Sequence, residues 1–228
     1  MNDLFQQTLR LPLPAVGIAF RDAPPSGVSH AGADPASCSY WKRAAGGEVF
    51  WTAAADHQGC PIGAHTHGVE MSEARREELM GLVGTMVQLG YIRREEVPSI
   101  PHRKTPLRIA VYAPLSKMPC APDVVLVRGS AAKLMVLIEA AQAAGVAPDA
   151  PAMGRPTCAV LPHALESRRP AMSLGCVGNR VYTGLEEGEG YVAIPGAALE
   201  AITSKLGALA RANVELEKFH RARVTGTA

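Results

Sequence analysis

The spacing of hydrophobic residues along the chain predicts short strands separated by helices and long loops. Runs rich in β-branched and aromatic residues are typical of strands, whereas apolar residues that recur every three or four positions are typical of helices. We expect strands at residues 16–20, 49–52, 107–112, 124–127 and 191–194, and helices at residues 38–45, 72–89, 133–144 and from 197 to about 220.

The segment from Ser72 to Gly90 predicts the clearest helix. Ser72 is a candidate N-cap, and glutamates follow it near the positive end of the helix dipole. Gly90 is a natural terminator. By contrast, residues 56–68 are rich in glycine and histidine and are expected to form a loop, and residues 158–161 only a short apolar run.

Strands and helices mix without strict alternation, so we expect an α+β (mixed α/β) fold in a single domain over residues 1–228. A chain of 228 residues buries roughly 70–75% of its unfolded surface. The core therefore needs neither a disulfide nor a metal ion to form.

Composition and charge exclude several classes of protein. The net charge is only +2 and aromatic residues make up 5%, so the chain has neither a basic stripe nor a base-stacking platform, and no nucleic-acid partner is expected. No apolar run reaches about 18 residues and the first residues lack a secretory signal, so we expect no membrane partner and a cytoplasmic protein. In a reducing cytosol, its five cysteines are core fillers, reactive thiols or metal ligands.

Four of the cysteines form the principal candidate site: Cys38, Cys60, Cys158 and Cys176. Four thiolates are the usual ligand set of an iron–sulfur cluster and also of structural zinc. Glycines beside two of them would let the backbone approach closely and aim N–H groups at sulfur. No C-x-x-C pair is present, and the alternative is that these thiols are small buried hydrophobes. Cys120 has no flanking glycine and is expected to be incidental.

The same four cysteines suggest an internal duplication. Each half of the chain has a strand, a first cysteine, a Gly-Cys loop and an amphipathic helix, over residues of about 15–90 and about 123–213. Two such halves packed about a pseudo-twofold axis would bring the four thiols together near that axis. Coincidence is the alternative, and different strand orders in the two segments would exclude a duplication.

Several motifs resemble a known family. In chain order they are Ser37-Cys38-Ser39-Tyr40-Trp41, Cys60-Pro61-Ile62-Gly63, Pro156-Thr157-Cys158-Ala159 and Ser173-Leu174-Gly175-Cys176-Val177-Gly178-Asn179-Arg180. Their order and spacing resemble the domain-of-unknown-function family numbered 169, from about residue 10 to about residue 210. The resemblance implies that cysteines match at the four candidate positions and that none matches Cys120. It strengthens the expectation of a metal or cluster site and implies little else, because the family is uncharacterised in the main.

Other residues offer weaker catalytic candidates. His57 beside Asp56 could act as a general base oriented by a carboxylate, and Arg180 could bind an anion. His65 and His67 form an H-x-H unit that would suit a metal on a strand. For all of these, an ordinary structural or solvent-exposed role is the alternative.

These observations lead to one principal hypothesis and one alternative. The first is a metal- or iron–sulfur-binding protein with ligands Cys38, Cys60, Cys158 and Cys176 and a redox or cluster-related role, in which zinc is the alternative cofactor. The second is a metal-free small-molecule-binding protein or enzyme with a pocket near Asp56, His57 and Arg180. Expected partners are a redox partner or a small molecule, and a second copy of the chain contacted through the long final helix. Whether the protein is an enzyme is left open.

Overall fold

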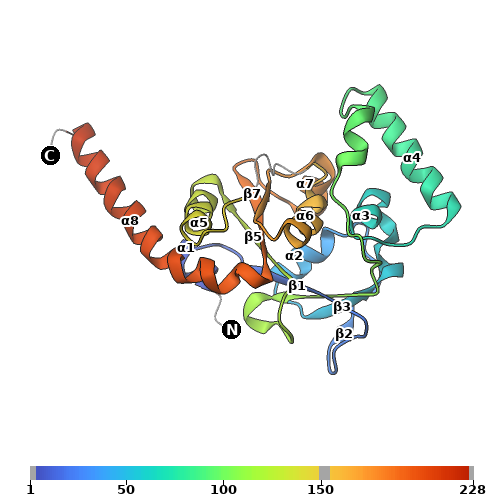
Figure 1. Ribbon diagram of the computed structural model, residues 1–228, viewed down its shortest axis with the longest axis horizontal. Helices are drawn as coiled ribbons and strands as arrows, with labels where there is room; N and C mark the ends of the chain where they lie inside the picture. The colour runs from blue at the N-terminus through green and yellow to red at the C-terminus, as the bar shows by residue number, and fades with distance from the viewer. Residues whose placement is uncertain (1–3, 149–154, 226–228) are drawn as a thin grey trace.

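The computed structural model describes residues 4–148 and 155–225, which form one α+β domain around a single seven-stranded sheet (Figure 1). The strand order is β2-β3-β4-β1-β5-β7-β6, and the sheet is mixed because β2 pairs parallel with β3 while the other pairs are antiparallel. The strands are β1 (Val16–Arg21), β2 (Ser29–His30), β3 (Phe50–Ala53), β4 (Ile109–Pro114), β5 (Val124–Ser130), β6 (Ala171–Ser173) and β7 (Glu189–Pro195).

Helices cover both faces of this sheet (Figure 1). The α-helices are α1 (Leu4–Leu9), α2 (Ser39–Ala45), α3 (Pro61–Thr66), α4 (Glu73–Gln88), α5 (Ala131–Ala143), α6 (Val160–Ser167), α7 (Val177–Thr183) and α8 (Leu199–Thr225). Short 3₁₀ helices are η1 (Ala54–Gly59), η2 (Arg94–Ser99), η3 (Leu115–Lys117), η4 (Thr157–Ala159) and η5 (Gly196–Ala198). In the described part of the chain, no helix is long and apolar enough to cross a membrane.

The two faces of the sheet have separate hydrophobic cores because side chains alternate along each strand. On β5, Val124 and Leu126 pack with α2 and α6, whereas Val125 and Val127 pack with α1, α5 and α8. The face covered by α2 and α6 also receives α3 and carries the aromatic side chains of Tyr40 and Trp41. All four candidate cysteines lie on this face, either within a helix or directly before one.

The order of elements is the same in the two halves of the chain. Apart from 3₁₀ helices, the chain runs from β1 to β4 through α2, β3 and α3, with β2 and α4 inserted, and from β5 to β7 through α6, β6 and α7, with α5 inserted. In each half the last strand lies between the first two in the sheet, and β1 and β5 pair at the centre. The duplication expected for residues 15–90 and 123–213 stays a prediction, and its first segment stops short of β4, which completes the first set of strands.

Equivalent hydrogen bonds close both halves. After β4, the Leu115 N–H donates to the carbonyl of Ala15 at 2.8 Å, and after β7 the Gly196 N–H donates to the carbonyl of Asp123 at 2.7 Å. Each bond returns the chain to the residue directly before the first strand of its half. The side chain of Asp123 further joins the halves, because its carboxylate accepts the Phe20 N–H at 2.6 Å and pairs with Arg21 at 2.8 Å.

Several expected elements are confirmed and others differ. Ser72 caps α4 by accepting the Arg75 N–H at 3.4 Å, and Gly90 ends the turn with a positive φ of 68°. The expected loop at residues 56–68 is wrong, because η1 and α3 occupy most of it, and the apolar run at 158–161 spans the end of η4 and the start of α6. Pro61 begins α3 at a position where its missing N–H costs nothing, and burial of Ala64 holds this short helix on the core.

Candidate functional site

Each of the four candidate cysteines lies at the start of a helix. Cys38, Cys60 and Cys176 are the residues directly before α2, α3 and α7. Cys158 lies in η4, which leads directly into α6. We call these four residues the cysteine cluster. Cys38 and Cys60 come from the first half of the chain and Cys158 and Cys176 from the second.

The members of the cysteine cluster lie close enough to influence one another electrostatically. The pKa of the Cys38 thiol is raised to about 12, chiefly by burial; Asn179 opposes the rise, and nearby Cys176 and Cys60 add to it. Burial also raises the pKa of the Cys158 thiol well above its usual value, with further contributions from Cys38, Cys176 and Cys60. Cys38 and Cys158 are therefore protonated near neutral pH, and all four cysteines are free thiols.

Side chains reach across from one half of the chain to the other at this cluster. The Asn179 amide, on α7, lies against the Cys38 thiol at the start of α2 and lowers its pKa. The Thr66 hydroxyl, on α3, lies beside the Cys158 thiol and lowers its pKa. The packing of the helices that carry these residues is consistent with these contacts, because α2 packs against α7 and α3 packs against η4. The cysteine cluster thus lies where the helices of the two halves meet.

The loop that carries Cys176 is fixed by Thr157, the neighbour of Cys158. The Cys176 N–H donates to Thr157 Oγ1 at 2.6 Å, and the Ser173 hydroxyl donates to the same oxygen at 3.3 Å. The Gly175 N–H donates to Ser173 Oγ at 3.2 Å. The N–H groups of Gly175 and Cys176 therefore bond to hydroxyls and are not aimed at sulfur, contrary to the expectation from the flanking glycine. Gly175 is required here because its φ is +87°.

The prediction of a metal or iron–sulfur centre at these cysteines is wrong. Among residues 4–148 and 155–225, no group of three or more His, Cys, Asp or Glu side chains is arranged to hold a metal ion. A tetrahedral thiolate site needs every sulfur at about 2.3 Å from one point, and its ligands are thiolates. The prediction of an iron–sulfur cluster, or of zinc in its place, depended on that centre, and no separate observation tests which cofactor it would hold.

Buried polar atoms without hydrogen bonds lie near the cysteine cluster. The Asn179 residue is 2% exposed, and neither its amide nitrogen nor its amide oxygen makes a hydrogen bond of ordinary geometry. Trp41 Nε1, on α2, and the hydroxyl of Tyr112, on β4, are also buried without a partner. Tyr112 is close enough to Cys38 for that thiol to raise its pKa, although burial is the main cause. A buried polar group without a hydrogen bond costs about 1–3 kcal/mol, and the Cys38 thiol is the neighbour on which the Asn179 amide acts.

A comparison with protein families places the chain in one of them. Residues 4–205 match the model of the family DUF169, described as "Uncharacterised ArCR". The chain belongs to the DUF169 family. No curated protein and no solved structure matches it. Membership in DUF169 therefore supports the resemblance predicted from the cysteine motifs and assigns no activity.

The alternative pocket near Asp56, His57 and Arg180 is not supported in this DUF169 protein. The Asp56 carboxylate accepts from the Ala53 N–H at 2.7 Å and contacts His30 Nε2 at 2.6 Å, so it does not orient His57. His57 is fully buried between Ser37 Oγ at 3.0 Å and Thr52 Oγ1 at 2.8 Å, and burial lowers its pKa well below the usual value. Its hydrogen-bonding capacity is used within the core.

Arg180 is likewise occupied by the backbone. Its guanidinium donates to the carbonyls of Leu174, Leu185, Glu186 and Glu189, which fold the segment after α7 around it. The described residues show no hydrogen bond or ion pair between Arg180 and either Asp56 or His57. The structural role that the sequence offered as the alternative is therefore the observed one.

The remaining candidates also separate in space. The His65 ring lies tilted against His102 with ring centroids 4.9 Å apart, whereas the His67 ring centroid lies 5.2 Å from that of His57, so the H-x-H unit at the end of α3 points in two directions. Cys120 packs against a small cluster at β1 and β4, apart from the cysteine cluster of this DUF169 protein. Sequence reasoning missed Asn179, Thr66 and Thr157, although Asn179 lies in the motif that carries Cys176.

Proposed function

We propose that this protein carries out thiol–disulfide exchange with a dithiol formed by Cys38 and Cys176, without a metal ion. The proposal is supported by one observation above the others: where α2 packs against α7, two free cysteines from opposite halves of the chain lie close enough for Cys176 to raise the pKa of Cys38. Cys38 is 8% exposed, whereas Cys176 is partly exposed. Cys176 is therefore the thiol that first attacks the substrate (the entering thiol), and the buried Cys38 is the one that later displaces the substrate from it (the resolving thiol).

The two thiols would act in sequence. The Cys176 thiolate attacks one sulfur of a disulfide substrate, which forms a mixed disulfide and releases the first substrate thiol after it takes up a proton. Cys38 then loses its proton and attacks the Cys176 sulfur, which forms the Cys38–Cys176 disulfide and releases the second substrate thiol. Two protein thiols are oxidised, one substrate disulfide is reduced to two thiols, and the two protons pass to those thiols. A second dithiol or thiol compound, such as glutathione, restores the reduced protein.

Asn179 has a clear part in the second step as a positioning residue. Its buried amide lies against Cys38 and favours the thiolate form of that residue. Because burial holds the pKa of Cys38 at about 12, this thiol reacts only when Cys176 holds a mixed disulfide directly beside it. The high pKa keeps the resolving thiol unreactive toward other oxidants.

The surface around Cys176 supports this order of events. Large apolar side chains near Cys176 in sequence are exposed to solvent: Leu174 (48%), Val177 (66%), Val181 (75%) and Tyr182 (38%). An exposed apolar surface is typical of a docking site, so a substrate can approach Cys176 along α7. Five free cysteines further suit a reducing compartment, which supports the expected cytoplasmic location.

The test is turnover by the full chain with oxidised glutathione as substrate and a dithiol as reductant. We expect Cys176→Ser to abolish turnover, and Cys38→Ser to stop after one mixed disulfide at Cys176, identified by mass spectrometry. Cys120→Ser is the matched control and is expected to keep full turnover, because Cys120 packs elsewhere. Turnover that survives Cys176→Ser in a folded protein would overturn the proposal.

A further inference from the structure

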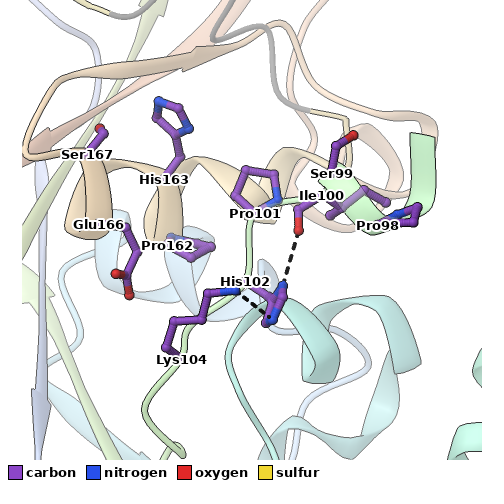
Figure 2. A pocket seen from close by; sticks show the side chains of 10 residues that line it. All are labelled: Pro98, Ser99, Ile100, Pro101, His102, Lys104, Pro162, His163, Glu166 and Ser167. Atoms are coloured by element: carbon purple, nitrogen blue, oxygen red, sulfur yellow. Dashed lines mark hydrogen bonds between the residues drawn. The ribbon is translucent and has the colours of Figure 1, made fainter. Parts of the chain in front are cut away.

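A pocket lies on the same side of the sheet as the cysteine cluster, between α6 and the segment after η2 (Figure 2). Its volume is about 230 Å³, which suits a ligand smaller than the drug-sized molecules of larger pockets. Its lining combines apolar rings and chains, such as Ile100, Pro101 and Pro162, with charged groups. No residue of the dithiol lines this pocket, so a ligand bound here would be independent of the proposed thiol exchange.

Two opposite charges line the pocket without pairing. Lys104 and Glu166 both contribute to the wall, and Figure 2 shows them on the same side of it. Lys104 Nζ has His102 Nε2 as its hydrogen-bond partner, at 3.3 Å. Both residues are exposed, and within the described residues neither forms an ion pair, although Glu166 lies close enough to Arg103 to oppose the lowering of that guanidinium's pKa by burial. A cation and an anion that share a small pocket but stay apart form a complement to a ligand with both charges.

The positive side of the pocket is oriented by a short chain of hydrogen bonds. An ammonium group can only donate, so Lys104 donates to His102 Nε2, and His102 Nδ1–H then donates to the Ile100 carbonyl at 3.2 Å. This chain holds the Lys104 ammonium group at the wall while its other two N–H bonds stay available. His163 points away from His102 and Lys104 in Figure 2, so it takes no part in this arrangement.

The negative side of the pocket is the last turn of α6. Glu166 and Ser167 are the final residues of this helix, and Arg168 comes next with a left-handed φ of 56°. The last carbonyls of a helix carry partial negative charge, which adds to the charge of the Glu166 carboxylate. This end of the pocket therefore favours a cation and disfavours phosphate or any other ligand with negative charge alone.

We propose that this pocket binds a free α-amino acid with an apolar side chain. The ligand's carboxylate pairs with Lys104, its ammonium group pairs with Glu166 beside the end of α6, and its side chain lies against Ile100, Pro101 and Pro162. A hydrocarbon would leave both charges unmatched, and a simple anion would meet Glu166. An amino acid satisfies both charges and covers the apolar wall.

The test is binding of L-leucine to the full chain, measured by isothermal titration calorimetry, with 4-methylpentanoate and 3-methylbutylamine as analogues that each lack one charge. We expect L-leucine to bind and each analogue to bind roughly tenfold or more weakly, as loss of one charged hydrogen bond predicts. Lys104→Met and Glu166→Gln are each expected to weaken L-leucine binding by a similar factor. Lys205→Met and Glu200→Gln, on exposed positions of α8, are the matched controls and are expected to bind as the natural chain does.

Three results would overturn the amino-acid site. One is no heat of binding for L-leucine, L-valine, L-proline or L-methionine at about 10 mM, which corresponds to an affinity too weak to matter. Another is equal binding by Glu166→Gln in a protein whose thermal midpoint is unchanged. The third is competition by inorganic phosphate as strong as that by L-valine. Because Cys38 and Cys176 do not line the pocket, thiol exchange without amino-acid binding would separate this proposal from the proposed function.

Discussion

The side-chain amide of Asn179 lies against the Cys38 thiol, and the two residues come from opposite halves of the chain. The amide is buried, and its nitrogen and oxygen make no hydrogen bond of ordinary geometry. This amide lowers the pKa of a thiol, which connects it to thiol chemistry more directly than to stability.

Replacing Asn179 is therefore expected to separate function from stability. In Asn179→Ala the pKa of Cys38 rises, and resolution of a mixed disulfide at Cys176 slows about three- to fourfold for each unit of that rise, because the loss of thiolate is partly offset by its greater nucleophilicity. The thermal midpoint stays the same or increases, because an unsatisfied buried amide is removed. Stopped-flow mixing with oxidised glutathione measures the resolution rate, and calorimetry measures the midpoint.

Asn213→Ala serves as the control for that experiment. Asn213 donates to Glu139 at 2.7 Å on the opposite face of the sheet, and its loss is expected to leave the resolution rate unchanged. A lower thermal midpoint together with a normal resolution rate in Asn179→Ala would assign the amide to the fold alone.

Acid is expected to destabilise the protein between pH 6.5 and about 4 through His67. Burial, with a smaller contribution from Arg103, lowers the pKa of His67 from 6.5 to about 4, although its bond to the Gly63 carbonyl opposes this. The folded pKa lies below the unfolded one, so His67 contributes stability above pH 6.5 that is lost as the pH falls toward 4. The loss amounts to about 1.4 kcal/mol per pH unit for this one group.

Urea unfolding at pH 7.5, 5.5 and 4.5 measures that loss, and His67→Asn is the informative variant. The Asn amide can replace the imidazole Nδ1–H that donates to Gly63 O at 2.8 Å, but it does not titrate in this range. We expect a smaller pH dependence in the variant. An identical dependence in both proteins would show that other groups carry the acid sensitivity.

Gly196 is expected to be the least replaceable glycine at the end of the second half. A Cβ at this position would lie 1.9 Å from the Pro122 carbonyl oxygen, in the turn that closes onto Asp123. Gly196→Ala is expected to lower the free energy of unfolding by about 1–3 kcal/mol through overpacking. Chemical unfolding followed by circular dichroism measures the change.

Gly207→Ala provides the matched comparison in α8. A Cβ there would meet only the end of the Arg211 side chain at 3.6 Å. Because alanine is the better helix former by about 1 kcal/mol, this variant is expected to be more stable than the natural chain. If Gly196→Ala were as stable as Gly207→Ala, the close approach of Gly196 to the Pro122 carbonyl would not be present in solution.

The strands could be predicted from sequence because local composition decides them. The runs at 16–20, 124–127 and 191–194 became β1, β5 and β7, where β-branched side chains pack on both faces of a covered sheet. The start of α4 was predicted equally well, because the capping residue Ser72 acts within one turn.

The short helices that begin at the cysteines could not be predicted in the same way. The α3 sequence contains Gly63 and Thr66, which are weak helix formers, and only contacts distant in sequence hold it. A Cβ on Gly63 would lie 2.8 Å from Ser37 Oγ, so the helix needs a glycine to approach α2. Tertiary packing overrides local propensity here.

The candidate site shows the same limit. The sequence identified the four cysteines, and the structure places them together, but counting thiols does not reveal where each sulfur points. The metal prediction failed for this reason. Asn179 and Thr157 carried no signal of their own, because amide and hydroxyl side chains are common in every loop.

A redox titration of the full chain tests the proposed dithiol most directly. The protein is equilibrated in glutathione buffers of known potential, its thiols are trapped, and its disulfides are mapped by mass spectrometry. We predict one two-electron transition that forms a Cys38–Cys176 disulfide, at a potential above about −300 mV, as for exchange-active disulfides. If oxidising buffers yield only glutathione adducts, or a disulfide that leaves out Cys38 or Cys176, the proposed dithiol is contradicted.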